Sequence, residues 1–284
     1  MNNHDLLKEA TKKLEDSDVY AGMAQMLLSE LYKWYGLDLY AEFYQEANSM
    51  IAAEFNRYLE RLLNNEPLDY IMGYTSFWGY EFKVDKGALI PRPETEELVS
   101  EVLMILDSKK KKLTGLDIGT GCGAIAITLA LEAENAKMYA CDISREAYYL
   151  ARENIFKHDA NVILKKSDVF SAFSGKTKFD FIVSNPPYIR NDEVLDKSVV
   201  DYEPHIALFG GVDGLDLYRR IFKEAGDYLK PSNFLAFEIG FDQADTLIEM
   251  AEISFPEAKL HISQDINGKN RMLFIFNNWE YNQF

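Results

Sequence analysis

The chain has 284 residues, 48% of them hydrophobic, and a formal net charge of −16. This length allows one large domain or two, and the apolar fraction is enough for a sizeable core. The acidic balance disfavours a nucleic-acid-binding protein, because such proteins neutralise phosphates with basic side chains.

Targeting and metal signals are missing from the sequence. No apolar run approaches the ~18 residues of a membrane span, and the N-terminal residues 1–5 carry no basic patch of a signal peptide. We therefore expect a cytoplasmic protein that does not contact membranes. The two cysteines, Cys122 and Cys141, are interpreted as small buried residues without a disulfide. The four histidines lack metal-ligand spacing, so no metal is expected.

The first ~80 residues lack strand patterns. Apolar residues recur at helical spacing from Leu6 to Leu14, from Val19 to Leu31 and from Ile51 to Leu62, which predicts a small helix bundle. Residues 75–84 then suggest a hairpin. We expect a helical domain over 1–73, a hairpin linker over 74–90 and a second domain over 91–284.

From Thr114 onward, predicted strands and helices alternate, which is typical of a doubly wound parallel sheet. The last two strands are joined by only four residues, 267–270, so they must be antiparallel neighbours. The predicted fold class is α/β: a seven-stranded, mostly parallel sheet with its last strand antiparallel, which resembles the methyltransferase variant of the Rossmann-like fold. The predicted strands are 114–119, 137–142, 161–167, 179–184, 233–239, 258–265 and 271–277, and the predicted helices are 123–133, 144–158, 214–230 and 241–252.

A glycine-rich turn follows the first of these strands. Gly119, Gly121 and Gly123 alternate with Thr120 and Cys122. Glycines let the backbone approach a ligand closely, and the following helix N-terminus offers free N–H groups. The third glycine comes one residue too early for the dinucleotide fingerprint. The arrangement resembles instead the first motif of S-adenosylmethionine-dependent methyltransferases.

Polar residues also end the next strands of the predicted sheet. Asp142 comes 23 residues after Gly119, close to the ~20 typical of an acid that binds ribose hydroxyls. Asp168 and Asn185 follow the third and fourth strands. Ligands of open α/β sheets bind at the carboxyl ends of the strands, so these four positions are expected to meet in one crevice. Each acid alone has the plainer interpretation of a turn or helix cap.

The fourth strand ends in the corner Asn185-Pro186-Pro187-Tyr188. Neither proline can donate a ladder hydrogen bond, so the strand stops there and the backbone stiffens. Such a corner presents a carboxamide oxygen, backbone carbonyls and an aromatic ring. These groups suit the capture of a planar NH2 group. The plainer interpretation is a strand that ends in a proline turn.

Together these segments resemble the protein-(glutamine N5) methyltransferases that modify peptide chain release factors. The resemblance covers nearly the whole chain. Its segments are Pro67 to Gly73, Leu89 to Glu96, Asp117 to Gly123, Asp142 to Ser144, Ser167 to Phe170, Ser184 to Ile189, Glu203 to Leu215 and Asp265 to Arg271.

The resemblance implies transfer of a methyl group from S-adenosylmethionine to the glutamine of a Gly-Gly-Gln loop, with S-adenosylhomocysteine as product. Gly119 to Gly123 are then assigned to the methionine and ribose side, Asp142 to the ribose hydroxyls, and Asp168 with Phe170 to the adenine. Asn185 to Tyr188 would bind the substrate, with Asn185, Pro186 and Tyr188 catalytic and Asn185 also next to the cofactor.

Release factors are the expected partner, and the helical domain would help to recognise them. A basic partner suits the acidic chain, and a monomer is expected. Residues 190–213 are expected to form a flap over the crevice.

Three alternatives remain from the sequence. A nucleic-acid methyltransferase of the N6-adenine type uses the same corner on an exocyclic amine, although the net acidity argues against it. A nicotinamide-dependent oxidoreductase is disfavoured by the glycine spacing. A binding module without catalysis is disfavoured by the intact corner at Asn185.

Overall fold

The computed structural model describes residues 1–281. The chain divides into two compact units. One contains Met1–Tyr74 together with Leu195–Tyr202, and the other contains Thr75–Val194 and the chain from Glu203 onward. Compared with the sequence-based boundaries, the hairpin belongs to the second unit, and a short piece of the later loop belongs to the first.

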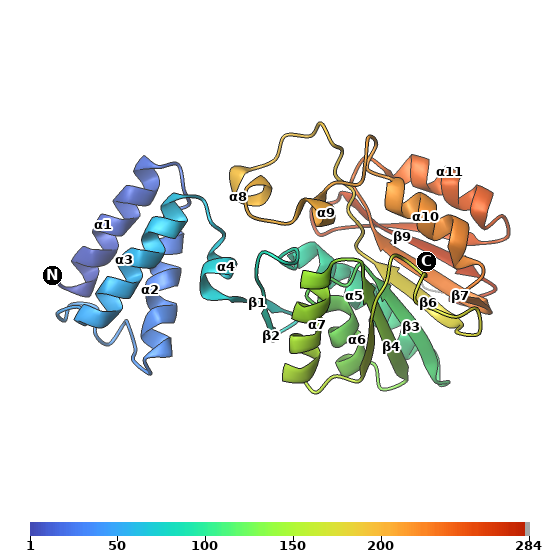
Figure 1. Cartoon of the computed structure of the whole chain (residues 1–284), viewed down its shortest axis with the longest axis horizontal. Coiled ribbons are helices and arrows are strands. Elements are labelled where there is room, and N and C mark those ends of the chain that lie inside the picture. The colour runs from blue at the N-terminus through green and yellow to red at the C-terminus, as the bar shows by residue number, and fades with distance from the viewer. Residues whose placement is uncertain (282–284) are drawn as a thin grey trace. The chain divides into compact units, whose positions relative to one another are not determined.

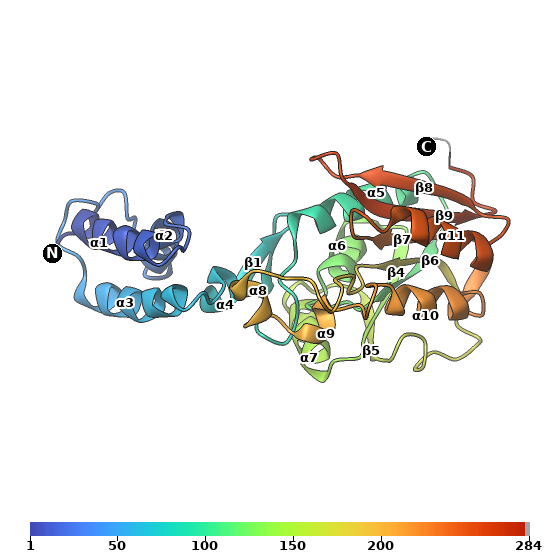
Figure 2. The same cartoon turned by 90° about the horizontal axis from the view of Figure 1, so that it is seen from above.

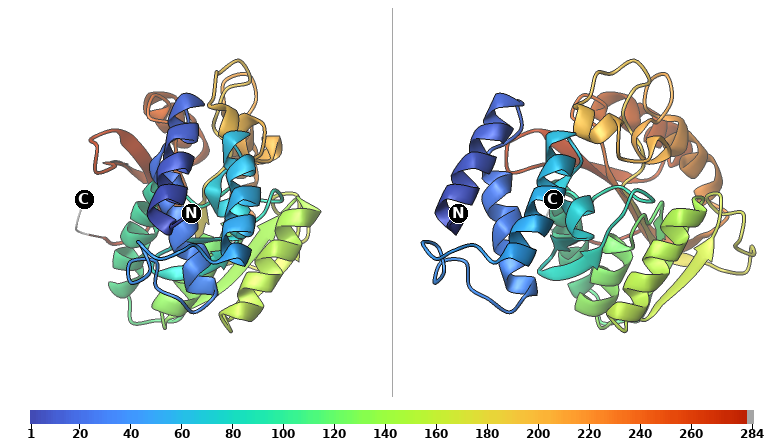
Figure 3. Two further views of the ribbon diagram at one scale, coloured as in Figure 1. Left: turned by 90° about the vertical axis from the view of Figure 1, so that its left-hand side faces the viewer. Right: turned by 60° about the vertical axis from the view of Figure 1, so that its left-hand side comes forward.

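The first unit is a helix bundle, as predicted. Its helices are α1 (Asn3–Asp16), α2 (Gly22–Trp34), α3 (Ser49–Leu63) and the short α4 (Leu68–Met72), and Figure 3 shows α1 to α3 in blue. Leu14, Leu28 and Phe55 are among the apolar residues of its core that are fully buried. The side chains of Asn2 and Asn48 accept hydrogen bonds from backbone amides at the starts of α1 and α3, which satisfies donors that a helix start leaves unpaired.

The predicted hairpin is present as β1 (Tyr74–Phe77) and β2 (Tyr80–Lys83). Its turn residues Trp78 and Gly79 have φ of 53° and 74°. Positive φ at both central residues is the conformation that two-residue hairpins favour. The side chain of Asn154 accepts from the N–H of Lys83 over 2.8 Å and donates to its carbonyl over 2.9 Å. This pair of bonds attaches β2 to helix α7 (Arg145–Lys157).

The second unit contains the predicted seven-stranded sheet. The strands are β3 (Leu113–Ile118), β4 (Ala136–Asp142), β5 (Val162–Lys166), β6 (Phe179–Ser184), β7 (Leu229–Glu238), β8 (Lys259–Gln264) and β9 (Asn270–Asn277). Their order is β5-β4-β3-β6-β7-β9-β8. All neighbours from β5 to β7 are parallel, and β9 runs antiparallel to β7 and β8. Figure 2 shows β8 at the edge of the sheet.

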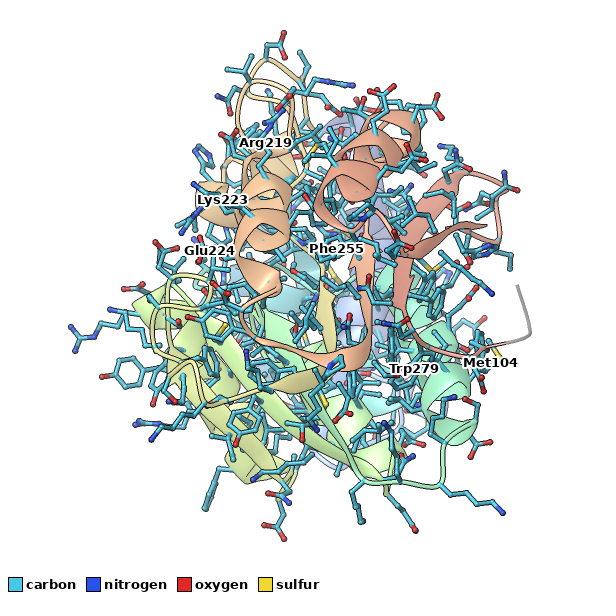
Figure 4. The ribbon with its side chains drawn as sticks, turned by 90° about the vertical axis from the view of Figure 1, so that its right-hand side faces the viewer. Met104, Arg219, Lys223, Glu224, Phe255 and Trp279 are labelled. Atoms are coloured by element: carbon cyan, nitrogen blue, oxygen red, sulfur yellow. The ribbon has the colours of Figure 1, made fainter. Side chains whose placement is uncertain are left out.

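Helices cover both faces of this sheet (Figure 1). On one side lie α5 (Pro93–Asp107), α6 (Ala124–Glu132) and α7. Helix α6 contacts both α5 and α7. On the other lie α10 (Asp216–Ala225) and α11 (Ala244–Ser254). The exposed face of α10 carries Arg219 and Lys223 (Figure 4), while its buried face packs into the core. The chain order changes direction between β3 and β6, which is where such sheets bind ligands.

Two helices of the second unit, α5 and α10, differ from the elements predicted from the sequence. Helix α5 was not predicted, because its start at Pro93 follows a proline-rich stretch that was interpreted only as an entry segment. The helix predicted over 214–230 ends at Ala225, because β7 begins already at Leu229. The loop over 190–213 contains two short helices, α8 (Lys197–Val200) and α9 (His205–Leu208). None of the helices within residues 1–281 is long and apolar enough to span a membrane.

Candidate active site

A cavity of about 300 Å³ lies in the second unit at the carboxyl ends of β3 to β6. The predicted meeting of four strand ends is confirmed, because residues from all four line this one cavity. The predicted site residues in its wall are Gly119, Thr120, Gly121, Cys122, Asp142, Asp168, Asn185 and Pro187. Gly123, Phe170, Pro186 and Tyr188 are not in the wall.

The glycine-rich turn is held in shape by its own hydrogen bonds. Gly119, Gly121 and Gly123 have φ of 72°, 57° and 93°, a region that favours glycine. The amides of Gly119 and Thr120 donate to the carbonyl of Cys141, over 2.9 and 3.0 Å. These amides are therefore used inside the chain, and this part of the turn supplies mainly a close-fitting backbone.

Two buried titratable groups, Asp117 and Cys122, lie at this turn. Asp117 is fully buried and accepts from the hydroxyl of Thr120 over 2.6 Å. Burial raises the pKa of Asp117 to about 7, against the effect of that hydrogen bond. Burial likewise raises the pKa of the Cys122 thiol to about 12, so this thiol is no nucleophile at neutral pH. Both cysteines are free and buried, as predicted.

Asp142 ends β4 with its carboxylate fixed in the cavity wall. One oxygen accepts from the N–H of Gly121 over 2.9 Å, and the other from the N–H of Ser144 over 2.8 Å. Burial raises the pKa of Asp142, and these amides oppose that effect. Each oxygen keeps a further lone pair. The carboxylate can therefore accept two more donors from a ligand, such as a pair of neighbouring hydroxyls.

The predicted adenine site is only partly formed. Asp168 lines the cavity, and its carboxylate lies 2.8 Å from the guanidinium of Arg220, which lines the cavity as well. Phe170 does not line it, which corrects the expectation of a ring against adenine. Its side chain is fully buried and stacks on Tyr228 with ring centroids 4.5 Å apart. The apolar wall next to Asp168 is Val169 instead, whose φ of 47° is strained for a β-branched residue.

The corner at the end of β6 is anchored by a buried hydrogen-bond chain. The side-chain nitrogen of Asn185 donates to the hydroxyl of Thr95 over 3.1 Å. This hydroxyl donates to one carboxylate oxygen of Glu238 over 2.6 Å. The phenol of Tyr188 donates to the other oxygen over 3.3 Å. Burial raises the pKa of Tyr188, so its phenol stays protonated at neutral pH. Both polar side chains of the corner thus depend on one carboxylate.

The backbone of the same corner packs against a loop of glycines. A Cβ on Gly210 would lie 2.3 Å from the carbonyl oxygen of Pro187, and a Cβ on Gly214 would lie 2.1 Å from that of Tyr188. The side chain of Gln243 donates to the Tyr188 carbonyl over 2.9 Å. The backbone also bridges Ile189 to Gly210 over 2.9 Å. These contacts leave the corner little freedom to move.

A second buried carboxylate fixes the part of the loop that lines the cavity. Glu203 accepts from the N–H of Ile90 over 3.2 Å and pairs with the guanidinium of Arg92. The Glu203 side chain is 2% exposed, so its charge needs these partners. These bonds attach Glu203 to the chain at Ile90 and Arg92. Pro204 and Ile206, which follow Glu203, both line the cavity.

Sequence reasoning did not assign roles to Thr95, Glu238, Gln243, Arg220 or Glu203. Glu238 could have been noticed in the sequence, because it is the one acid inside the apolar run 234–239, and a buried acid is costly unless it is paired. Thr95 had none of its own, since its partner in β7 lies 143 residues away. Among residues 1–281, no group of three or more His, Cys, Asp or Glu side chains is arranged to hold a metal ion.

The comparisons with known proteins agree with this geometry. The model of the methyltransferase small domain matches residues 97–202, and that of the PrmC N-terminal domain matches residues 5–73. A methyltransferase from Pyrococcus furiosus has a similar structure, with a TM-score of 0.52, 22% identity, and coverage of 79% of this chain and 99% of that one. The sheet, the cavity and these matches define an S-adenosylmethionine-dependent methyltransferase.

Proteins with similar sequences identify the family within this class of methyltransferases. The release factor glutamine methyltransferase of Streptococcus pneumoniae is 45% identical over 76% of this chain and 77% of its own length. That of Bacillus cereus is 37% identical over 96% of this chain and 99% of its own length. The chain belongs to the release factor glutamine methyltransferase family.

Proposed function

We propose that this enzyme transfers a methyl group from S-adenosylmethionine to the side-chain nitrogen (N5) of the glutamine in the Gly-Gly-Gln motif of peptide chain release factors. The observation that carries the proposal is the orientation of Asn185 in the cavity wall. Its NH2 group donates to Thr95, so its side-chain oxygen is left to accept a hydrogen bond from a ligand.

The acceptor chemistry explains why such an oxygen is useful. A carboxamide nitrogen is a weak nucleophile, because its lone pair is delocalised into the carbonyl. No side chain here can deprotonate it at neutral pH. The Asn185 oxygen and the Pro186 carbonyl would each accept one N–H of the substrate and aim its nitrogen. Both hydrogen bonds strengthen as this nitrogen becomes more positive in the transition state.

The role of Tyr188 follows from its place behind the corner. It is partly buried and packs against the core cluster that contains residues of β6 and β7. Its ring would support the plane of the substrate amide, and its phenol is held by Glu238. Positioning of this kind converts binding energy into rate without an added acid or base.

The cavity fits the proposed cofactor. Asp142 would accept the ribose hydroxyls with the lone pairs that Gly121 and Ser144 leave free. The backbone from Gly119 to Cys122 would lie against the methionine side, and Asp168 with Val169 against the adenine. When bound, S-adenosylmethionine supplies a methyl group on a sulfonium, whose neutral leaving group needs no protonation, and the methylated nitrogen releases one of its two protons to solvent. S-adenosylhomocysteine is then the product, and no metal takes part.

The charge of the chain supports the proposed partner. A net charge of −16 favours steering toward a basic protein surface, and release factors act against ribosomal RNA. We infer that the enzyme acts in the cytoplasm as a monomer and does not bind nucleic acid directly. The helical unit would contribute to recognition of the release factor.

The test is methyl transfer from labelled S-adenosylmethionine to a purified release factor, to DNA and to RNA in parallel. Label should enter the release factor alone, and mass spectrometry should place it on the glutamine of the Gly-Gly-Gln loop. Label in an adenine of DNA or RNA instead would identify the nucleic-acid alternative. Label in none of the three would refute the proposal.

A further inference from the structure

Glu238 is a buried carboxylate at the carboxyl end of β7. Its side chain follows the apolar second half of this strand, and the residue is 1% exposed. Burial raises the pKa of Glu238, while the hydrogen bond from Thr95 and the charge of Arg271 oppose this effect. A buried charge is retained only where its partners are well placed. Two of its side-chain donors, Thr95 and Tyr188, lead directly to the Asn185 corner.

The direction of the two hydrogen bonds that link Asn185, Thr95 and Glu238 follows from the number of protons that each group can donate. The hydroxyl of Thr95 has one proton to donate. It lies 2.6 Å from a carboxylate oxygen of Glu238, which has no proton to give when ionised, so the hydroxyl donates to Glu238. The hydroxyl oxygen can then only accept from its other partner, which lies 3.1 Å away. That partner must be the NH2 group of Asn185, and not its oxygen.

We propose that Glu238, acting through Thr95, is a positioning residue that fixes which way the Asn185 amide faces. This inference rests on the proposed function, because the amide orientation matters only if Asn185 must accept a hydrogen bond from a substrate NH2 group. Without the carboxylate, the Thr95 hydroxyl is free to donate to the Asn185 oxygen. The amide can then turn over and present its own NH2 group to the substrate, donor against donor.

The charged and titratable groups around Glu238 fit this role. Arg271 of β9 and Glu94 of α5 both act on its pKa, in opposite directions. Tyr188 donates to its second oxygen, and Tyr218 of α10 donates to its backbone carbonyl over 2.6 Å. The Thr95 and Tyr188 hydroxyls therefore donate to the carboxylate of Glu238, and the Tyr218 hydroxyl donates to its backbone carbonyl. The bonds from Asn185 through Thr95 run in one direction, from the cavity to the carboxylate.

The kinetic test compares Thr95→Val, which removes the hydroxyl at nearly constant shape, with Thr95→Ser, which keeps it. We expect kcat on a release factor to fall roughly 10–100-fold in Thr95→Val and to recover in Thr95→Ser to within a few fold of wild type, with the Kd for S-adenosylmethionine nearly unchanged in both. Glu238→Gln, whose amide can donate to Thr95, should lower kcat similarly. The double variant should be no worse than the more impaired single variant.

The matched control is Thr128→Val in α6. The Thr128 hydroxyl is fully buried and has no hydrogen-bond partner among residues 1–281, and the residue does not line the cavity. Its replacement should leave kcat within about twofold of wild type. Wild-type kcat in Thr95→Val, or a double variant whose losses multiply, would overturn the proposal.

A second readout does not depend on the substrate. The side-chain NH2 signal of Asn185, assigned by its absence in Asn185→Asp, can be followed by ¹H–¹⁵N NMR. One of its protons should be shifted and slowly exchanging in wild type and in Thr95→Ser, and should lose both properties in Thr95→Val and Glu238→Gln. A signal that these two variants leave unchanged refutes the relay, even if no release factor is methylated. Loss of that signal together with an inactive wild type would refute the proposed function alone.

Discussion

The amide nitrogen of Asn185 donates to the hydroxyl of Thr95, although 90 residues of sequence separate the two. Asn185 follows a central strand of the sheet, and Thr95 lies in the first turn of a helix that covers it. Their contact turns a strand-end asparagine into an oriented acceptor at the cavity wall.

Replacement of Asn185 by alanine removes the proposed acceptor. By analogy with the loss of one oxyanion-hole donor, kcat should fall roughly 10²–10³-fold, or about 2.7–4 kcal/mol. Single-turnover methyl transfer to a release factor measures this effect. The Kd for S-adenosylmethionine, measured on the same sample, separates a loss of chemistry from a loss of cofactor. Near-normal turnover would show that Asn185 is not the acceptor.

Asp142→Ala should weaken cofactor binding. A hydrogen bond to a charged group contributes about 1.5–3 kcal/mol, so Kd should rise roughly 10–100-fold in calorimetry. Asp142→Asn keeps the size of the side chain but exchanges one acceptor for a donor, so its Kd should rise as well. The folded fraction, followed by circular dichroism, controls for loss of the backbone contacts at Gly121 and Ser144. An unchanged Kd would exclude the ribose role.

The loop that supports the corner can be tested with a single methyl group. In Gly210→Ala, the new Cβ would lie 2.3 Å from the carbonyl oxygen of Pro187 and 2.6 Å from that of Gly214. These are backbone atoms, so the loop must shift, at a cost of about 1–3 kcal/mol for an overpacked site. We expect a lower Tm and a lower kcat.

Gly226→Ala is the matched control for this loop. Gly226 caps α10 in a helical conformation, and a Cβ there meets no atom of the described chain within 4 Å. Alanine at such a position should leave stability unchanged or raise it by about 0.4–1 kcal/mol. If the two alanine variants have the same Tm and kcat, the close packing of Gly210 does not support the corner.

Asp117 should give the stability a definite pH dependence. Its pKa is about 7 in the folded protein, raised by burial from 3.8. Between these two values the native state holds a proton that the unfolded state releases, so this group makes the protein less stable as pH rises through that window.

Asp117→Asn should remove this effect. The free energy of unfolding of both proteins can be measured with urea at several pH values. From pH 4 to pH 7 that of the variant should rise relative to wild type by up to roughly 4 kcal/mol, since one pKa unit corresponds to about 1.4 kcal/mol. Above that window the difference should stay constant. Parallel curves over the whole range would contradict a raised pKa for Asp117.

Much of this site could be predicted because its parts follow directly from strand ends. Parallel strands share one carboxyl edge, so Gly119, Asp142, Asp168 and Asn185 were expected together and are found together. The single reversed strand followed from the short turn between the last two strands.

Other parts could not be predicted because they depend on packing between distant elements. Thr95 and Glu238 meet only once α5 lies on β7. Phe170 shows the opposite problem, since an aromatic residue beside a binding loop has the same sequence pattern whether it faces a ligand or the core. Its stacking on Tyr228 decided for the core.

The most direct measurement is a crystal structure of the enzyme with S-adenosylhomocysteine and a release factor. The account predicts that the glutamine NH2 group donates to the side-chain oxygen of Asn185 while the Asn185 nitrogen remains on Thr95. A complex in which that oxygen faces Thr95, or in which the glutamine binds away from the corner, would contradict it.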